Sequence, residues 1–392
     1  MVPAHLLSLF RAIRHAGGRA LVVGGAVRDH LRGEPNKDVD IEVHALDADA
    51  LLAVLRRFGR VDEVGRSFGV LKLRIGGQDV DVSLPRRDSQ AGAGHRGIHV
   101  ESDPEMGVIE AARRRDLTIN AIAWDPVSSE FVDPFDGRKD LAAGVLRAVD
   151  PTTFTEDPLR ALRVAQFAAR FAFRIDPTLE DLCAGMPLDE LPAERIRGEV
   201  EKLFLKGQRP SIGWEFARRA GIWAKVLPTW NRDAPDALDR LASAAVRARI
   251  PEPARRFALM LACACDPDAL DPLNRMHIHR WERYPVREAV VFLVAAAHRD
   301  LGSESAVVRL ADRGDVELLA TLRNDDALIS LATRLGVLRT PLPALLLGRD
   351  LLALGVSAGP DVGSILAELR ELQFDGHITT AKDALAWART RL

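Results

Sequence analysis

Cysteine is scarce in this sequence. Only three cysteines occur among 392 residues, Cys183, Cys263 and Cys265, which argues against a disulfide framework and indicates a reducing compartment. The last two are spaced as half of a metal site, but no second Cys/His pair with zinc-finger spacing accompanies them. Two buried small residues are therefore the better interpretation of this pair.

Long apolar runs and an excess of charge of one sign are also absent. No apolar run approaches membrane-spanning length, and the N-terminal stretch carries Arg11, Arg14 and His15 after its apolar residues, unlike a signal peptide. We therefore expect a cytoplasmic protein. The net charge of −2 gives no global attraction to a polyanion. Any nucleic-acid surface must then be a local concentration of arginine, and residues 113–115 are one visible run.

The overall composition is that of a globular protein, and its length indicates several domains. The chain is 47% apolar and 28% charged, which is typical of soluble globular proteins. Because 392 residues are too many for one ordinary core, we expect about two to four units.

A glycine pair interrupts the apolar stretch that begins at Leu21. Three apolar residues predict a short buried strand, Gly24 and Gly25 break it, and the residues up to Asp29 predict the start of a helix. Backbone N–H groups are unpaired at such a helix start, and glycine has no Cβ to keep an anion away. A phosphate could bind there, although a glycine pair alone is usually only a turn.

Two aspartates follow closely. Asp38 and Asp40 flank one apolar residue in the next expected strand, so the period of two puts both carboxylates on one face. Like charges this close repel unless a cation bridges them, and Mg²⁺ fits such oxygen ligands best. An isolated Asp-x-Asp is most often a solvated strand edge. Because this pair follows directly after a glycine turn that could bind a phosphate, it instead indicates a site for nucleotidyl transfer.

In this order and spacing, the two stretches resemble the DNA-polymerase-β type of nucleotidyltransferase, and more narrowly the bacterial tRNA nucleotidyltransferases and poly(A) polymerases. The resemblance implies that Gly24, Gly25 and Arg28 hold a triphosphate. It also implies that Asp38 and Asp40 hold Mg²⁺ and act in catalysis.

The resemblance further implies a third carboxylate on the strand after the metal pair. In residues 78–83, Asp79 and Asp81 share one face, and Asp81 is the candidate by position. A half-solvated strand is the alternative. Residues 84–104 then change to Pro, Gly, Ser, His and Arg, which predicts a long loop that could close over the nucleotide or guide the acceptor strand.

Residues 113–121 match the second motif of this family, Arg-Arg-Asp-x-x-x-Asn-Ala. Asp116 and Asn120 lie four residues apart, one helical turn, and would project together as an acceptor and a donor suited to a ribose. In the family the aspartate contacts the sugar and selects ribonucleotides, and the resemblance implies that role for Asp116.

Residues 156–160 open a helix and carry the pattern Glu-Asp-x-x-Arg. Asp157 and Arg160 alone could be an ordinary dipole-favoured pair. The pattern is also the family's nucleobase motif, in which the carboxylate accepts from the amino group shared by C and A and the guanidinium donates to ring acceptors. Arg163, three residues after Arg160, is a further nucleotide-binding candidate. Residues 194–202 match the family's helical motif after this helix, and there Arg195 and Arg197 could steady the triphosphate or the base-reading helix, or form a charged solvent face.

The C-terminal half is helical by pattern and lacks catalytic signals. Many bacterial relatives carry a metal phosphohydrolase unit here, signalled by a His-Asp pair, but residues 257–266 contain none, and we predict no phosphohydrolase activity. His277 and His279 are more often surface or capping residues than a metal site. Residues 347–390 resemble the C-terminal segment of the longer bacterial CCA-adding enzymes, which implies that this segment binds tRNA away from its 3′ end.

Together these observations predict an α+β fold with a mixed β-sheet head, helices on one side of the sheet, and an all-α remainder. The expected parts are a catalytic head, a helical neck, a helical body without a phosphohydrolase site, and a tRNA-binding tail, at residues 1–145, 146–230, 231–345 and 346–392. The expected activity is template-independent addition of C and A from CTP and ATP to the tRNA 3′ end, with Mg²⁺ as cofactor. The alternatives are a CC-only or A-only enzyme, a poly(A) polymerase, or a non-catalytic RNA-binding relative.

Overall fold

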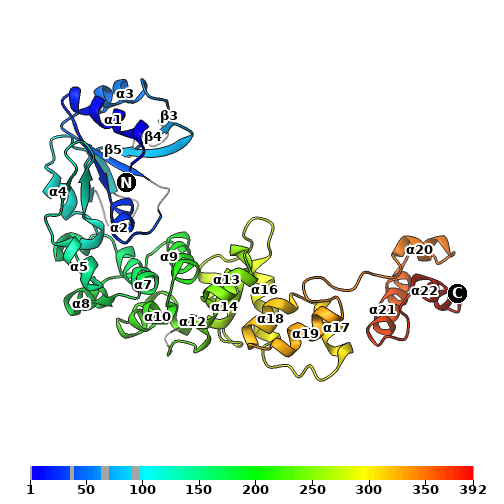
Figure 1. Cartoon of the computed structure of the whole chain (residues 1–392). Helices are drawn as coiled ribbons and strands as arrows, with labels where there is room; N and C mark the ends of the chain where they lie inside the picture. Colours follow the sequence, from blue (N-terminus) through cyan, green and yellow to red (C-terminus); the bar gives the residue numbers. More distant parts are fainter. Residues whose placement is uncertain (1, 36–38, 63–69, 91–97, 231, 392) are drawn as a thin grey trace. The chain divides into compact units, whose positions relative to one another are not determined.

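The computed structural model describes residues 2–35, 39–62, 70–90, 98–230 and 232–391. They form two compact units, Met1–Asp233 and Ala234–Leu392 (Figure 1). The first unit contains a mixed sheet followed by helices, and the second is helical, so the predicted fold class is confirmed. The finer division into head, neck, body and tail stays a prediction. No helix in the described ranges is both long and apolar enough to cross a membrane.

In the described residues of the first unit, seven strands form one sheet in the order β3-β4-β5-β2-β1-β8-β9. Neighbouring strands are antiparallel except β2 and β5, which are parallel. The strands are β1 (Arg19–Val23), β2 (Asp40–His44), β3 (Arg60–Asp62), β4 (Val70–Ile75), β5 (Gln78–Ser83), β8 (Ala123–Asp125) and β9 (Glu130–Val132).

The two faces of this sheet differ because side chains alternate along each strand. Ile41, Val43 and Val80 are buried in a core with the apolar faces of α1 (Ala4–His15) and α3 (Ala48–Leu55). The opposite face carries the acidic residues of β2 and β5. Helices α1 and α3 therefore cover one face of the sheet, and the acidic residues lie on the other.

The rest of the first unit is mainly helical. Its elements are α2 (Gly25–Leu31), α4 (Val108–Arg113), the 3₁₀ helix η3 (Thr118–Asn120), α5 (Gly137–Ala143), α6 (Pro151–Phe154), α7 (Leu159–Phe171), α8 (Pro177–Gly185), α9 (Ala193–Lys206), α10 (Pro210–Arg219), α11 (Ile222–Val226) and the 3₁₀ helix η4 (Pro228–Trp230), with the short parallel pair β10 (Val145–Leu146) and β11 (Arg174–Ile175). Helices α9 and α10 both pack on α7. Gly213 allows α10 to approach closely, since a Cβ there would lie 2.2 Å from the Ala165 carbonyl oxygen.

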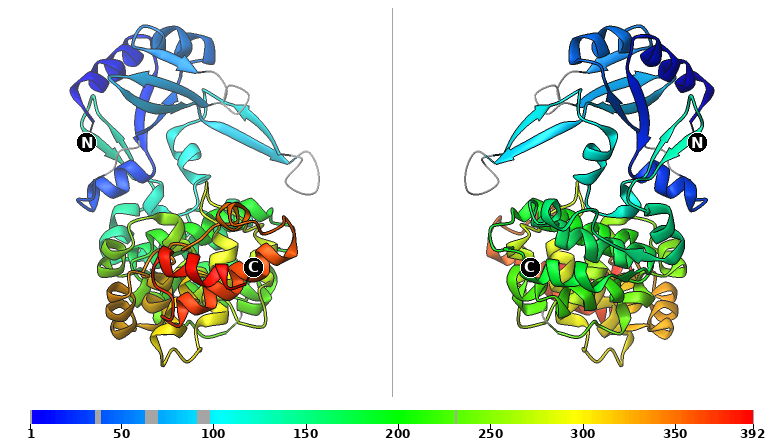
Figure 2. Two further views of the ribbon diagram at one scale, coloured as in Figure 1. Left: turned by 90° about the vertical axis from the view of Figure 1, so that its right-hand side faces the viewer. Right: turned by 90° about the vertical axis from the view of Figure 1, so that its left-hand side faces the viewer.

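Residues 84–104 are not a loop throughout, so that prediction was wrong. Strands β6 (Arg86–Gln90) and β7 (Ile98–Ser102) pair antiparallel in a separate two-stranded sheet. The glycine-rich composition that predicted a loop is concentrated in residues 91–97, which lie outside the described residues. Figure 2 shows the paired strands, in cyan, extending away from the main sheet.

The regular elements described in the second unit are all helices, joined by turns and loops. Its helices are α12 (Ala237–Leu241), α13 (Ala244–Arg249), α14 (Pro253–Ala264), α15 (Asp271–Arg275), α16 (Val286–Ala296), α17 (Glu304–Ala311), α18 (Val316–Arg323), α19 (Asp326–Arg334), α20 (Gly348–Ala353), α21 (Pro360–Phe374) and α22 (Ala381–Arg389). The last three share a small apolar core that includes Leu351, Leu369 and Ala384. None of the three cysteines, all of which lie in the described residues, forms a disulfide bond.

Candidate active site

The glycine turn predicted from the sequence is present between β1 and α2. Gly24 has φ +67°, a left-handed conformation that favours glycine. A Cβ at Gly24 would lie 3.3 Å from Arg115 Nη1 and 4.0 Å from Asp40 Oδ2. The turn is thus within reach of a guanidinium on one side and a carboxylate on the other.

Carboxylates from two neighbouring strands meet beside this turn. Asp40 in β2 and Asp81 in β5 are direct partners in the parallel register, so their side chains project from the same face. Both line one cavity. Asp79 instead forms an ion pair with Arg74 at 3.6 Å and is not among the residues that line the cavity. Asp38, the other predicted metal ligand, lies outside the described residues.

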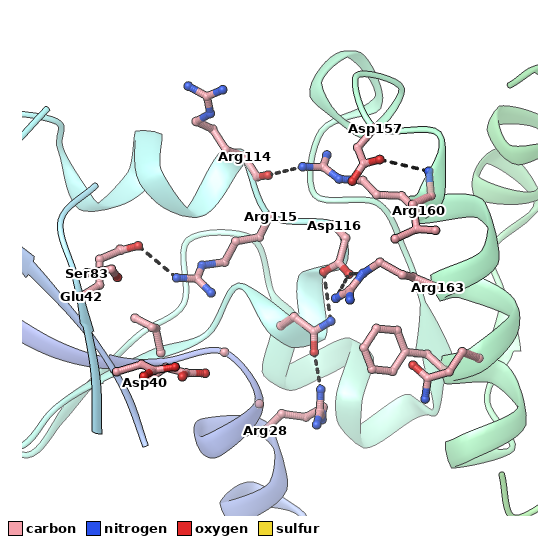
Figure 3. Close-up of a pocket in the computed structure, with 18 of the residues that line it drawn as sticks. Arg28, Asp40, Glu42, Ser83, Arg114, Arg115, Asp116, Asp157, Arg160 and Arg163 are labelled. Carbon is pink, nitrogen blue, oxygen red and sulfur yellow. Dashed lines mark hydrogen bonds and ion pairs between the residues drawn. The ribbon is translucent and has the colours of Figure 1, made fainter. Parts of the chain in front are cut away.

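A buried chain of hydrogen bonds connects α2, η3 and α7. Arg28 Nη1 donates to Asn120 Oδ1 at 2.6 Å, and Asn120 Nδ2 donates to Asp116 Oδ1 at 3.0 Å. Arg163 Nε donates to Asp116 Oδ2 at 2.8 Å (Figure 3). Asp116 and Asn120 are therefore joined as predicted, but not across an α-helical turn, because only residues 118–120 are helical and that helix is 3₁₀.

The surroundings of Asp116 stabilise its charged form. Burial raises the pKa of this carboxyl, but the positive charge of Arg163 and hydrogen bonds from Asn120, Arg163 and the Leu117 N–H outweigh burial. The net result is a pKa below the ordinary value. For the buried Arg28, loss of solvation lowers the pKa, partly offset by its ion pair with Asp29.

Asp157 and Arg160 both line the cavity, and the Arg160 N–H donates to the Asp157 carbonyl at 2.9 Å, but their side chains have different partners. Asp157 Oδ2 accepts from Arg195 Nη2 at 2.8 Å. Arg160 donates from Nη1 to the Thr153 carbonyl at 2.6 Å and from Nη2 to the Arg114 carbonyl at 2.7 Å (Figure 3). Burial lowers the pKa of Arg160 despite neighbouring acidic groups. Each side chain is thus fixed by its own partners, and Arg195 steadies Asp157.

One cavity of about 690 Å³ collects every predicted site residue except Asp38. Those lining it are Gly24, Gly25, Arg28, Asp40, Asp81, Asp116, Asn120, Asp157, Arg160 and Arg163. A volume of this size is in the range of small-molecule sites. The walls combine carboxylates near the sheet with arginines from α7, which suits a ligand that carries both a metal-bound phosphate and a polar base.

Several lining residues were not predicted as site residues. They include Glu42, Ser83, Gln166, Phe167, Arg170, Lys202 and Lys206. Glu42 lies two residues after Asp40, so the strand period could have placed it on the same face. Arg170 lies seven residues after Arg163, two helical turns along α7. Lys202 is the last residue of the motif at 194–202, whereas Lys206 lies beyond it and is brought to the cavity by the packing of α9 on α7.

Comparison with known family models gives a match to part of the chain. Residues 20–147 match the family model described as "Poly A polymerase head domain". The predicted resemblance to the tRNA nucleotidyltransferase and poly(A) polymerase family is therefore confirmed for the head.

Among curated proteins, the chain is similar to two proteins called "Multifunctional CCA protein". It is 39% identical to that of Nitrosococcus oceani over 211 residues, which cover 53% of this chain and 50% of the relative. It is 39% identical to that of Pseudomonas fluorescens over 217 residues, covering 54% and 51%. The chain thus spans about half the length of the curated relatives it matches.

Solved structures share the fold over the whole chain. The Bacillus stearothermophilus CCA-adding enzyme in complex with CTP has a TM-score of 0.73 at 24% identity, covering 100% of this chain and 98% of that one. The Thermotoga maritima CCA-adding enzyme complexed with tRNA has a TM-score of 0.65 at 21% identity, covering 100% and 96%.

Proposed function

We propose that the protein is a template-independent tRNA nucleotidyltransferase that adds C and A from CTP and ATP to the tRNA 3′ end. The observation that carries the proposal is the convergence in one cavity of glycine-turn, carboxylate and Glu-Asp-x-x-Arg residues that are far apart in sequence. The names of the similar proteins, which refer to CCA addition, CTP and tRNA, agree with it. We also propose that it acts in the cytoplasm.

The donor set of the acidic strands fits a hard divalent cation. Asp40 and Asp81 offer carboxylate oxygens from one face of two paired strands, which suits Mg²⁺. Asp40, with Asp38 and Asp81, would hold the ion beside the glycine turn. When bound, the ion supplies charge neutralisation for in-line attack of the tRNA 3′-hydroxyl on the α-phosphate with release of pyrophosphate.

The remaining residues bind and orient the nucleotide. Gly24, Gly25 and Arg28 would hold the triphosphate, because the turn leaves room and the buried guanidinium is fixed by Asn120. Asp116 with Asn120 would receive the ribose, where a carboxylate can accept from the 2′-hydroxyl. Arg163 keeps that carboxylate charged and oriented.

Base choice would depend on Asp157 and Arg160. Their hydrogen bonds to protein fix both side chains without exhausting them, since a guanidinium has five N–H donors and a carboxylate about four acceptor sites. Asp157 would accept from the amino group of C or A, and Arg160 would donate to ring acceptors. U and G lack that amino donor at the equivalent edge, so the hydrogen bond from the base to Asp157 would be lost, which disfavours them. The C-terminal helices α20–α22 would contact the tRNA away from its 3′ end.

Labelled nucleotides test the proposal. Purified protein is incubated with tRNA transcripts that end before CCA, after C and after CC, with each of the four labelled NTPs in turn. The proposal predicts C incorporation into the first two transcripts, A into the third, and little U or G. Only C or only A addition, or long A tails, would identify one of the alternative enzymes, and no incorporation would indicate a non-catalytic relative.

A further inference from the structure

Strand β2 carries a second acidic group on the cavity face, two residues beyond Asp40. Glu42 lies two residues after Asp40, and its side chain is only 13% exposed. Oε2 is 3.1 Å from Arg115 Nη2, and Oε1 is 3.2 Å from His44 Nε2. Glu42 is therefore held between two partners.

His44 fixes Glu42 from the far side. Its ring is 5% exposed, and Nδ1 lies 3.0 Å from the Met106 carbonyl oxygen, which can only accept. The ring is thus anchored to the segment before α4 and presents Nε2 to Glu42. The Glu42 carboxylate contacts both His44 and Arg115, and His44 is itself held by the Met106 carbonyl. Glu42 therefore has few other conformations available.

Arg115 is the group that this arrangement holds in place. Its Nη1 lies 3.3 Å from the position of a Cβ on Gly24, and Asp40 Oδ2 lies 4.0 Å from the same point. Figure 3 shows the Arg115 side chain extending toward Glu42, with Asp40 nearby. A long arginine without Glu42 would have many rotamers available. Glu42 therefore keeps the guanidinium near the glycine turn.

We propose that Glu42 and His44 are positioning residues that hold the Arg115 guanidinium over the Gly24 turn to bind the triphosphate of the incoming nucleotide. This inference rests on the proposed function, because it takes a nucleoside triphosphate as the ligand. The contact is to phosphate oxygens, so it serves CTP and ATP equally and does not select the base.

Calorimetric titration of the full-length protein with Mg²⁺ and CTP, ATP or CMP, without tRNA, tests the proposal. Glu42→Ala should weaken binding of CTP and of ATP by about tenfold, the effect of one misplaced charge-assisted contact. CMP lacks the β- and γ-phosphates, so its affinity should change by less than about twofold. Glu105→Ala, at an exposed acidic residue before α4, is the matched control and should leave all three affinities unchanged.

A double-mutant cycle tests whether Glu42 acts through Arg115. Arg115→Ala should weaken CTP binding, and adding Glu42→Ala should then change it by less than about twofold. Glu42→Gln keeps the side-chain volume and should show the same pattern with a smaller loss, which covers the case that the alanine variant unfolds.

The proposal is overturned if Glu42→Ala leaves CTP binding unchanged, if it weakens CMP and CTP alike, or if its full effect persists without Arg115. Wild-type protein that binds CTP but does not transfer it to tRNA would contradict the proposed function, while the same titrations still decide the role of Glu42. Absence of CTP binding in the wild type would contradict both.

Discussion

Asp116 is a buried carboxylate whose charge depends on its neighbours. Arg163 and Asn120 each donate to a different oxygen of this group, and its pKa is below the ordinary value. Because the folded-state pKa is depressed, the stabilisation is fully present above the unfolded-state pKa of about 3.9 and is lost as pH falls through the lower folded-state value.

Asp116→Asn should lower the free energy of unfolding by about 3 kcal/mol, because it leaves Arg163 without its buried partner. Urea denaturation between pH 7 and pH 3 checks this. The difference between wild type and variant should stay constant down to about pH 5 and shrink only below about pH 4. A difference that disappears already between pH 7 and pH 5 would contradict the direction of the shift.

Asp157 is expected to control nucleotide choice rather than stability. Asp157→Asn replaces an acceptor by a group that both donates and accepts, so U and G should be rejected less strongly. We expect the ratio of CTP to UTP incorporation to fall about tenfold, the discrimination carried by one polar contact to a base. Asp181→Asn, at an exposed aspartate of α8, is the control. An unchanged ratio in Asp157→Asn would remove Asp157 from base recognition.

At the scale of elements, the close approach of α7 and α10 depends on one glycine. A Cβ at Gly213 would lie 2.2 Å from the Ala165 carbonyl oxygen of α7, whereas a Cβ at Gly198 in α9 meets nothing within 4 Å. Gly213→Ala should therefore destabilise the protein by about 1–3 kcal/mol through overpacking. Gly198→Ala should stabilise it by about 0.5–1 kcal/mol, because alanine favours the helix.

Chemical denaturation of both glycine variants measures these effects. Equal effects of the two substitutions would show that helix propensity, and not the contact between α7 and α10, governs the result.

The elements that position the site follow from local sequence. Alternation predicts β5 and the shared face of Asp79 and Asp81, and the glycine pair predicts the turn before α2. The hairpin β6–β7 was missed, because its composition is that of a loop and its pairing joins residues across 91–97.

Contacts that depend on long-range packing could not be predicted. The hydrogen bond between Arg28 and Asn120 joins residues 92 apart in sequence, and no local pattern encodes it. Likewise, the spacing of Asp157 and Arg160 suggested an ion pair between these two side chains, but the Asp157 carboxylate accepts a hydrogen bond from Arg195 of α9 instead.

For the whole molecule, the cavity draws on residues from Val23 to Lys206, so the proposed active site needs both the sheet and the helices α7 and α9. The proposed activity depends on the carboxylates of β2 and β5 acting on a nucleotide bound at the glycine turn. Asp40 is the described residue that tests this most directly, because it lies at the turn and pairs in register with Asp81.

The decisive measurement is the rate of labelled CTP incorporation into a tRNA transcript lacking CCA, for wild type, Asp40→Asn and Asp79→Asn. Asp79 shares the β5 face with Asp81 but lies outside the cavity lining, so it is the matched control. We predict equal rates within about twofold for wild type and Asp79→Asn, and a loss of about a thousandfold for a folded Asp40→Asn. An Asp40→Asn protein that retains the wild-type rate would contradict the account.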